Sequence, residues 1–443
     1  MATPDRYLPA ARALFEQIAR DADLPLQVEL WDGSRVALGA NAGGNAAPAL
    51  ALSDAGVLRR LLRRPTLETV ARLYADGRIA VVGMDLLGFV ERARQHKVRL
   101  RLGDLDKWAL VKRAWPLLFA PDRPEHLTHV YAGDATGRAQ TKRDERAFIQ
   151  FHYDVSNAFY RLFLDPEMQY SCAYFTAWDN GIQQAQHDKL EMICRKLRLN
   201  PGDRFLDVGC GWGGLICHAA RHHGVQAHGV TLSKTQYDWA LGKIAAEGLQ
   251  DRVTVELKDY RELTGPYDKI ASIGMYEHVG IQNYPDYFSQ LNRLLADRGL
   301  LLNHGITRGA KKSARRFNRI RPENRLIRKY IFPGSELDHI GHTLSVMEAH
   351  RFQVHDVEGW REHYAWTTRL WYRALIDREA AARAEVGDEK YRMWIAYLAG
   401  VSLSFQDGSL RIFQTLASKH KGKGPSGLPP TRADLYRDAP GGL

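Results

Sequence analysis

From about residue 147 onward, short apolar segments alternate with segments that show helical periodicity. Alternation of this kind is typical of βαβ units, which build a mostly parallel sheet with helices on both faces. We therefore predict an α/β fold with a doubly wound sheet for this part of the chain. The expected strands are 204–208, 226–232, 253–257, 269–273, 300–306 and 352–357, and the expected helices are 187–197, 213–222, 235–247 and 284–294.

The preceding residues follow a different pattern. Apolar residues from Ala11 to Ala19 recur at helical spacing, and residues 28–38 have the pattern of a hairpin with a tight turn. Helical patterns then run with breaks over 53–96, which indicates a small α+β domain. The expected organisation is an N-terminal domain over 1–105, a linker or interfacial helix over 106–146, the main domain over 147–425 and a tail over 426–443.

The charge of the chain is unevenly distributed. The 443 residues carry a formal net charge of +11, from 62 Lys and Arg against 51 Asp and Glu. Residues 307–329 include ten basic residues and one acid, so +9 of this excess lies in one stretch. A basic excess indicates an anionic partner such as nucleic acid, anionic lipid or a phosphorylated ligand, and composition does not choose among them. A solvated surface is the ordinary alternative for any charge run.

The sequence also bears on the compartment. No uncharged apolar run approaches the roughly 18 residues of a membrane span. The first residues lead into a mixed-charge helix and not an apolar signal core, so we expect a cytoplasmic protein. The cysteines form no CxxC pair and no paired metal-ligand spacing, which fits a reducing compartment and predicts no metal site. They are Cys172, Cys194, Cys210 and Cys217.

A glycine-rich turn follows the first strand of the alternating region and opens a helix. In it, Gly209, Gly211 and Gly214 satisfy the dinucleotide fingerprint, and such glycines let the backbone approach a ligand at a helix N-terminus. A dinucleotide site requires an acid at the end of the second strand, but residues 229–233 contain none. Asp207, before the first glycine, instead resembles the first motif of class I S-adenosylmethionine methyltransferases. A glycine turn that binds no ligand is the remaining alternative.

Several longer motifs surround this loop, at 152–160, 163–165, 170–175, 206–214, 231–236, 275–280 and 303–306. In this order they resemble the cyclopropane-fatty-acid-phospholipid synthases and the related mycolic acid cyclopropane synthases, over residues 151–413. The resemblance implies a Rossmann-like S-adenosylmethionine methyltransferase domain after an N-terminal lipid-docking domain. It also implies a homodimer at the inner face of the cell membrane, acting on phospholipid acyl chains at an anionic surface.

The resemblance assigns one group of residues to S-adenosylmethionine. Asp259 and Tyr260 stand where the mycolate enzymes have Gly-Trp, and Tyr260 can still stack on an adenine ring. The expected cofactor residues are Tyr170, Ser171, Asp207, Gly209, Gly211, Gly213, Thr231, Leu232, Gln236, Asp259 and Tyr260.

A second group falls on the family's bicarbonate site, and we expect its members to be catalytic. Ring closure on an isolated cis double bond requires a base that removes a proton from the newly added methyl group. A side-chain carboxylate could itself be alkylated, so bound bicarbonate is the expected base. His304 and Tyr364 would donate hydrogen bonds to it, while Glu277 would accept its proton or fix His304. The group consists of Cys172, Glu277, His304, Ile306 and Tyr364.

Each of these residues also has an ordinary structural explanation. Cys172 lies in an aromatic segment that suits a packing cysteine, and His304 ends an apolar strand where satisfied buried histidines are common. Glu277 and His304 follow the carboxyl ends of strands, where open α/β sheets bind ligands, and this favours a catalytic role. Family members often carry a cysteine in a C-terminal helix, but the corresponding residue here is Val401, so we expect no covalent cysteine chemistry.

Other functions fit parts of the same pattern. A methyl or exocyclic methylene group could be added without ring closure, or the substrate could be a small molecule. A nucleic-acid methyltransferase would fit the charge, but residues 272–277 lack the Asn/Asp-Pro-Pro-Tyr/Phe motif of amino-directed enzymes. We therefore expect no nucleic-acid partner. A non-enzymatic membrane-binding protein is disfavoured because the catalytic group is intact.

Overall fold

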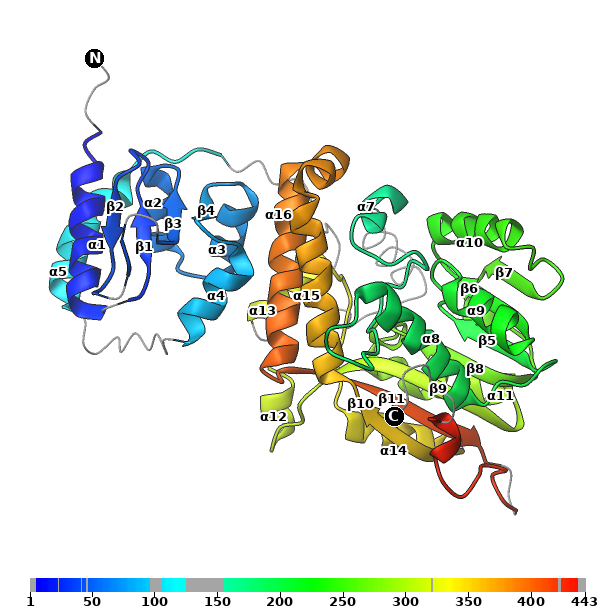
Figure 1. Cartoon of the computed structure of the whole chain (residues 1–443). Coiled ribbons are helices and arrows are strands. Elements are labelled where there is room, and N and C mark those ends of the chain that lie inside the picture. Colours follow the sequence, from blue (N-terminus) through cyan, green and yellow to red (C-terminus); the bar gives the residue numbers. More distant parts are fainter. Residues whose placement is uncertain are drawn as a thin grey trace. The chain divides into compact units, whose positions relative to one another are not determined.

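The computed structural model describes residues 5–22, 24–40, 42–44, 47–95, 106–124, 155–319, 322–420 and 424–436. Its contacts divide the chain into two compact units, whose elements are labelled in Figure 1. The first unit comprises 1–130, 321–326 and 379–400, and the second comprises 131–320, 327–378 and 401–443. Most of the expected linker and the motif residues 152–154 lie outside the described residues. No described helix is long and apolar enough to cross a membrane.

The first unit is built on a four-stranded sheet with the order β2-β1-β3-β4. Its strands are β1 (Gln27–Glu29), β2 (Arg35–Ala37), β3 (Ala49–Leu52) and β4 (Ile79–Val82), and its helices include α1 (Leu8–Ala22), α2 (Ala55–Arg63), α3 (Leu67–Ala75), α4 (Leu86–Gln95), α5 (Lys107–Ala114) and η1 (Trp115–Phe119). The predicted hairpin is β1 and β2, with a φ of +80° at Gly33 in the turn. The sequence analysis missed β3 and β4, because strands of only four residues leave little periodic signal.

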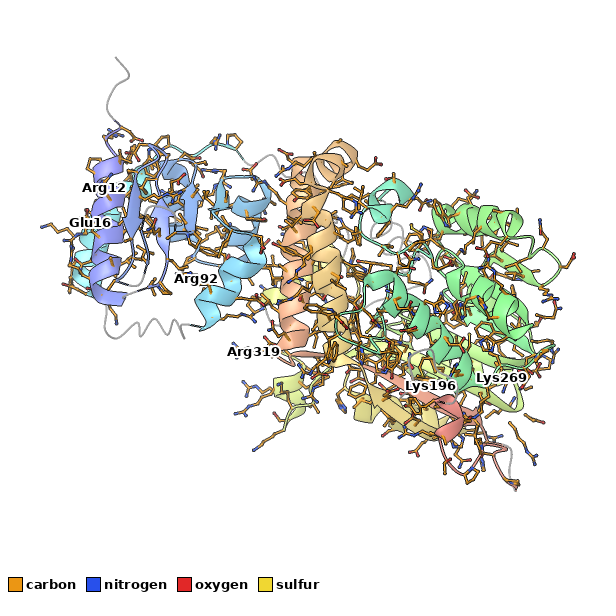
Figure 2. The ribbon with its side chains drawn as sticks, in the orientation of Figure 1. Arg12, Glu16, Arg92, Lys196, Lys269 and Arg319 are labelled. Carbon is orange, nitrogen blue, oxygen red and sulfur yellow. The ribbon has the colours of Figure 1, made fainter. Side chains whose placement is uncertain are left out.

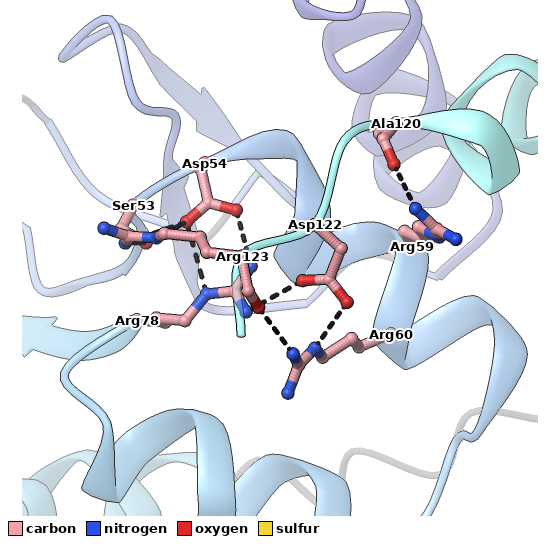
Figure 3. Close-up of polar contacts among 8 residues, drawn as sticks. All are labelled: Ser53, Asp54, Arg59, Arg60, Arg78, Ala120, Asp122 and Arg123. Atoms are coloured by element: carbon pink, nitrogen blue, oxygen red, sulfur yellow. Dashed lines mark hydrogen bonds and ion pairs between the residues drawn. The ribbon is translucent and has the colours of Figure 1, made fainter. Parts of the chain in front are cut away.

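Residues 106–120 pack on the core of the first unit, where Leu117 is fully buried. Asp122, which follows this segment, is held by the buried guanidinium of Arg78. Its Nη2 lies 2.6 Å from Asp54 Oδ1 and its Nη1 lies 3.0 Å from Asp122 Oδ1 (Figure 3). The described part of the expected linker is therefore fastened to the N-terminal unit.

The second unit contains a seven-stranded sheet with the order β10-β11-β9-β8-β5-β6-β7. Its strands are β5 (Arg204–Val208), β6 (Gln226–Thr231), β7 (Val253–Leu257), β8 (Tyr267–Ile273), β9 (Leu295–Arg308), β10 (Phe352–Gly359) and β11 (Leu410–Lys419). All of them except β11 were predicted. Strand β11 runs antiparallel to both β9 and β10, and the alternation of βαβ units gives no sign of a strand that returns in this way.

Helices cover both faces of this sheet, which confirms the predicted doubly wound α/β fold. Side chains such as Phe205 face α8 (Ile182–Leu197), α9 (Gly214–His223) and α10 (Lys234–Ala246). The next residue along the strand, Leu206, faces the opposite layer of α11 (Tyr284–Leu294) and α14 (Ile340–Ala349), as the period of a strand requires. The remaining helices are α7 (Asn157–Arg161), α12 (Ala314–Phe317), α13 (Pro322–Tyr330), α15 (Arg361–Asp377), α16 (Glu379–Gln406), η2 (Tyr260–Glu262), η3 (Tyr276–His278), η4 (Ile281–Asn283) and η5 (Ala433–Leu435).

Part of the C-terminal tail packs on the second unit. Leu435 is buried, and its carbonyl accepts a hydrogen bond from Arg195 Nη1 on α8 at 3.2 Å. The Arg198 guanidinium lies 2.9 Å from the carboxylate of Asp434. The described residues 424–436 are therefore held by α8 and by the residue that follows it.

Candidate active site

The glycine loop joins β5 to α9 at the point where the strand order reverses, because β6 pairs with one edge of β5 and β8 with the other. Open α/β sheets bind ligands at switch points of this kind. Gly209 and Gly213 have φ values of +80° and +84°, which favour glycine. A Cβ atom at Gly209 would lie 3.0 Å from the Cγ of Met275, so the turn leaves little room for a side chain.

A cavity beside this loop brings together most of the expected cofactor residues. Loop backbone, strand ends, hydroxyl groups and an aromatic ring form its wall, as suits a nucleoside with a polar tail. The predicted residues in the wall are Tyr170, Ser171, Asp207, Gly209, Gly211, Thr231, Leu232, Gln236 and Tyr260. Trp212 of the glycine loop and Arg261, which follows Tyr260, are in the wall as well. Residues that the sequence analysis missed are also there, among them Gln169, Lys189, Lys258 and His278.

The structure does not place Gly213 and Asp259 among the lining residues. A Cβ atom at Gly213 would lie 3.1 Å from that of Ala240, so this glycine lets α9 approach α10 closely. Asp259 is buried and accepts hydrogen bonds from three groups of Arg261, namely the backbone N and Nε at 2.9 Å and Nη2 at 2.6 Å. Asp259 therefore orients Arg261, whose side chain is the one in the wall.

The wall contains one buried base and one buried acid. Lys189 Nζ donates to Gln169 Oε1 at 2.5 Å and to Ser171 Oγ at 3.0 Å, and burial lowers the pKa of Lys189 to about 8. Burial raises the pKa of Asp207 to about 7, against the opposing charge of Lys189. Asp207 Oδ1 is buried with no hydrogen-bond partner among the described residues. Such an acceptor fits a ligand that brings its own donor, as the ammonium group of S-adenosylmethionine does.

Glu277 lies in η3, shortly after the end of β8. Its Oε1 accepts a hydrogen bond from the backbone N of Ile306 at 2.6 Å, so these two predicted residues are in contact. Its Oε2 is buried and has no hydrogen-bond partner in the described part of the chain. Burial raises the pKa of Glu277 to about 7. The carboxyl group thus offers one oxygen to a ligand while the other is fixed by the backbone.

His304 lies on β9 and is held by polar side chains from α8 and β11. Lys196 Nζ donates to Gln414 Oε1 at 2.9 Å, and Gln414 Nε2 lies 3.0 Å from His304 Nδ1; Lys196 is labelled in Figure 2. An ammonium group only donates, so the Gln414 amide nitrogen must face the ring and donate to Nδ1. The ring proton is therefore on His304 Nε2, which is buried without a partner among the described residues. Burial holds the pKa of His304 well below its usual range, so the ring is a neutral donor.

Trp360, which the sequence analysis missed, connects three of the predicted residues. Its indole ring is perpendicular to the ring of His304, with 5.2 Å between the centroids. Its carbonyl accepts a hydrogen bond from the backbone N of Tyr364 at 3.1 Å and lies 3.8 Å from Cys172 Sγ. Trp360 precedes α15 and lies outside the motifs, so the only sequence signal was its position four residues before Tyr364.

The two sets of residues adjoin each other. The backbone N of Gly274, which lines the cavity, donates to the carbonyl of His304 at 2.9 Å. Met275 and His278, on either side of Glu277 in sequence, also line the cavity. The five predicted catalytic residues are outside its lining, and Glu277 and His304 contact the segment that forms the wall.

A doubly wound sheet with a glycine loop at its switch point, an acceptor-lined cavity and an adjoining polar site defines the class of Rossmann-like S-adenosylmethionine-dependent methyltransferases. Comparison with known proteins agrees. The profile of the family described as mycolic acid cyclopropane synthetase matches residues 140–415. The chain belongs to this family, which confirms the prediction made from the motifs.

Individual relatives support this membership. The chain is 38% identical over 417 residues to a probable fatty acid methyltransferase of Pseudomonas putida, covering 94% of this chain and 97% of the relative. It is 38% identical over 304 residues to the cyclopropane-fatty-acyl-phospholipid synthase of Escherichia coli, covering 67% and 74%. The crystal structure of the mycolic acid cyclopropane synthase CmaA1 with SAH and CTAB superposes with a TM-score of 0.59 at 35% identity, covering 62% of this chain and 98% of that one.

Cys172→Ser is expected to retain turnover within roughly tenfold of the wild type, because only weak sulfur hydrogen bonds change. Burial raises the pKa of the Cys172 thiol well above its usual range, so the sulfur is not a thiolate nucleophile. Its Sγ lies 3.3 Å from the carbonyl of Ala173, to which a serine hydroxyl can also donate. Turnover assays and intact-protein mass spectrometry check this expectation. A methylated Cys172 that goes on to product would contradict it.

Proposed function

We propose that the protein transfers a methylene group from S-adenosylmethionine to the cis double bond of unsaturated acyl chains in membrane phospholipids, forming a cyclopropane ring with bound bicarbonate as the base. One observation carries the proposal. His304 Nε2 offers a proton and Glu277 Oε2 offers a lone pair, and both atoms are buried without partners among the described residues. Bicarbonate has acceptor oxygens and one hydroxyl donor, so it can satisfy both atoms.

The chain's own residues would hold the base and keep the site dry. When bound, S-adenosylmethionine supplies an electrophilic methyl group, from which a proton must leave before the ring closes. His304 would donate to an oxygen of bicarbonate and Glu277 would accept from its hydroxyl, and bicarbonate held in this way would supply the base for the methyl proton. Trp360 and Tyr276 are buried next to this position and help to exclude water, which would otherwise trap the cation as an alcohol.

A second candidate differs only in how the reaction ends. The relative from Pseudomonas putida, which matches 94% of this chain, is described as a probable fatty acid methyltransferase. A product with a methyl or exocyclic methylene group would therefore use the same cofactor, the same acyl chains and the same cation. The difference would lie in which proton leaves and whether the ring closes.

Lipid analysis of cells that express the protein distinguishes these outcomes. The proposal expects unsaturated chains to gain the mass of one CH₂ group, to lose the alkene proton signal and to show cyclopropane protons. Cells that express Glu277→Gln are the matched control and should show no such change. A gain of the same mass with retained alkene protons would favour the second candidate, and unmodified lipids would reject both.

We further propose that the enzyme is a peripheral, cytoplasmic homodimer that docks on the inner face of the cell membrane. The phospholipid acyl chain cannot leave the bilayer cheaply, since each exposed CH₂ group costs about 0.8 kcal/mol. In the second unit, a basic segment follows β9, the strand that carries His304. Its cations are exposed, and no ion pair links them to other described residues; they are Lys311, Lys312, Arg315, Arg316 and Arg319, the last labelled in Figure 2.

The N-terminal unit contributes a second surface of the kind that binds lipid. One face of α5 and η1 exposes large apolar side chains, with exposed fractions of 85% for Trp108, 59% for Trp115 and 60% for Phe119. The other face packs on the core through Leu110 and Ala114. Exposed tryptophan beside basic residues is typical of helices that lie in a membrane interface, which supports a lipid-docking role for this unit.

Replacing Arg315, Arg316 and Arg319 together by Glu is expected to weaken binding to anionic vesicles by more than about 100-fold, since loss of three cations at about 1 kcal/mol each already gives that factor and the new acids add repulsion. The matched triple replacement by Gln should have a smaller effect, and wild-type binding should fall as salt rises. Vesicle co-sedimentation at low and high salt measures both, while S-adenosylmethionine affinity reports on folding. Unchanged vesicle binding by the Glu variant would make this segment an ordinary solvated surface.

A further inference from the structure

A group of ligand-type side chains lies between α8 and α9, separate from the site described above. On α8, Glu191 and Cys194 are three residues apart and so lie on one side of the helix. On α9, His218 and His223 face them. We call these four residues the α8–α9 cluster. Two further histidines flank it, with ring centroids 5.3 Å and 4.5 Å from that of His218; they are His187 and His222.

Three residues of the cluster bring their ligand atoms together. One ligand atom from each of Cys194, His218 and His223 lies within 4.8 Å of the others. Glu191 Oε2 lies 3.4 Å from His218 Nε2 and 3.0 Å from His223 Nε2. The other oxygen of Glu191 accepts from Arg195 Nε at 2.7 Å, which holds the carboxylate in this orientation. Arg195, which is outside the cluster, therefore fixes the orientation of the Glu191 carboxylate.

These separations suit a tetrahedral metal ion. Zinc lies about 2.0–2.3 Å from nitrogen, oxygen and sulfur ligands, so neighbouring ligand atoms in a tetrahedral site are roughly 3.3–3.8 Å apart. An ion-pair network would explain the two histidines around Glu191, and packing in the apolar core would explain Cys194. The Cys194 thiol is fully buried, and no hydrogen bond from it is seen among the described residues. A metal would instead give the thiol and the two imidazole rings one common partner.

Exposure indicates what kind of site this is. The exposed fraction of the side chain is 5% for His218, 18% for His223 and 24% for Glu191. Sulfur and imidazole ligands select zinc and similar borderline ions over magnesium or calcium. The three protein ligands are buried or half-buried, and the Glu191 carboxylate lies beside two of them.

We propose that Cys194, His218 and His223 bind one zinc-class divalent ion that joins α8 to α9, with the Glu191 carboxylate beside the two histidines. The metal–sulfur bond forms as the Cys194 S–H bond breaks, and the proton is released to solvent. Helix α8 carries Lys189 of the cofactor cavity, and α9 begins at the glycine loop. The ion would therefore hold together two elements that build the cofactor site, without contacting the cofactor.

The test uses the full-length protein, stripped with a chelator and titrated with Co²⁺ and then with Zn²⁺. We expect one Co²⁺ per chain, with the visible bands of tetrahedral cobalt and a near-ultraviolet thiolate-to-metal band. Cys194→Ser should remove the thiolate band. His218→Ala and His223→Ala should each weaken zinc affinity by more than about tenfold, because even changes to outer-sphere partners cost about 10–100-fold.

Matched controls keep the result interpretable. Cys217→Ser changes another buried cysteine on α9, and His355→Ala changes a histidine of β10; neither should alter metal binding. Zinc should also raise the melting temperature of the wild type and of both controls, but not of Cys194→Ser. Circular dichroism and S-adenosylmethionine binding identify any variant that fails to fold. Zinc affinity equal in the wild type, Cys194→Ser and His218→Ala would overturn the proposal, whatever the lipid product is.

Discussion

Glu277→Gln is expected to lower turnover by at least about 100-fold and to leave the affinity for S-adenosylmethionine within about twofold of the wild type. General acid–base groups contribute about 10²–10⁴ in rate, and the substituted side chain would present an amide to bicarbonate in place of a second acceptor oxygen. The contact from the Ile306 backbone N can persist, since an amide oxygen also accepts. Single-turnover rates and calorimetric cofactor binding separate the two quantities.

The same substitution is expected to stabilise the protein above pH 7. Burial raises the pKa of Glu277 from 4.5 to about 7, so the folded state binds this proton more tightly than the unfolded state. Ionisation then costs roughly 3 kcal/mol, a cost that appears as pH rises from about 4.5 and is complete above about 7. The neutral amide of the variant avoids this cost. Melting curves of the two proteins should therefore differ at pH 8 and converge near pH 4.

His304→Ala tests the same anion site as Glu277→Gln. It removes the proposed donor to the anion and should also lower turnover with little change in cofactor affinity. Both residues lie outside the cavity lining, which is why binding and chemistry should separate. A large loss of cofactor affinity with unchanged turnover at saturation, in either variant, would contradict the assignment of the pair to the anion site.

Gln414→Glu is expected to reduce turnover by about 100-fold, because it would move the ring proton of His304 from Nε2 to Nδ1. A carboxylate at this position can only accept, so Nδ1 of His304 would carry the ring proton and Nε2 would present a lone pair to bicarbonate. The Lys196 ammonium, which already pairs with Glu358, could also bind the new carboxylate, so the variant adds one negative charge beside an existing ion pair. Donation to the anion would be lost although His304 itself is unchanged.

The tautomer of His304 is the decisive measurement, because a merely structural role for Gln414 would not predict it. Nitrogen-15 spectra of the ring should show Nε2–H in the wild type and Nδ1–H in Gln414→Glu. The bicarbonate concentration needed for half-maximal rate should rise in the variant, while cofactor affinity should not. Unchanged turnover in Gln414→Glu, or Nε2–H in both proteins, would contradict this account.

The sequence predicts those features that depend on local pattern. Strands such as 204–208 have a continuous apolar signal, and the glycine loop is recognisable because a tight turn at a helix N-terminus requires those glycines. The residues around it follow from the resemblance, and most of them line the cavity. The resemblance does not predict that Asp259 lies outside the lining. Only the side-chain geometry shows that its carboxylate oxygens accept hydrogen bonds from Arg261.

What the sequence could not predict arises from contacts between distant segments. Trp360 meets Cys172 and His304 only through the folded sheet, and the Lys196–Gln414–His304 chain joins α8, β11 and β9. The α8–α9 cluster is invisible to a search for ligand spacing, because its members come from two helices. The strand β11 was missed for the same reason, since only its neighbours identify it as a central strand.

The place of β11 makes the centre of the sheet depend on the end of the chain. Strand β10 pairs only with β11 in this sheet, and β11 also supplies the residue that sets the proton on His304. Domains fold during synthesis as their segments emerge from the ribosome, at about 5–20 residues per second. Every residue that lines the cofactor cavity emerges before Leu410, yet the catalytic histidine obtains its partner only afterwards. The side chain that sets the ring proton of His304 is thus among the last of this unit to be synthesised, and β11 residues such as Leu416 complete the apolar core at the same time.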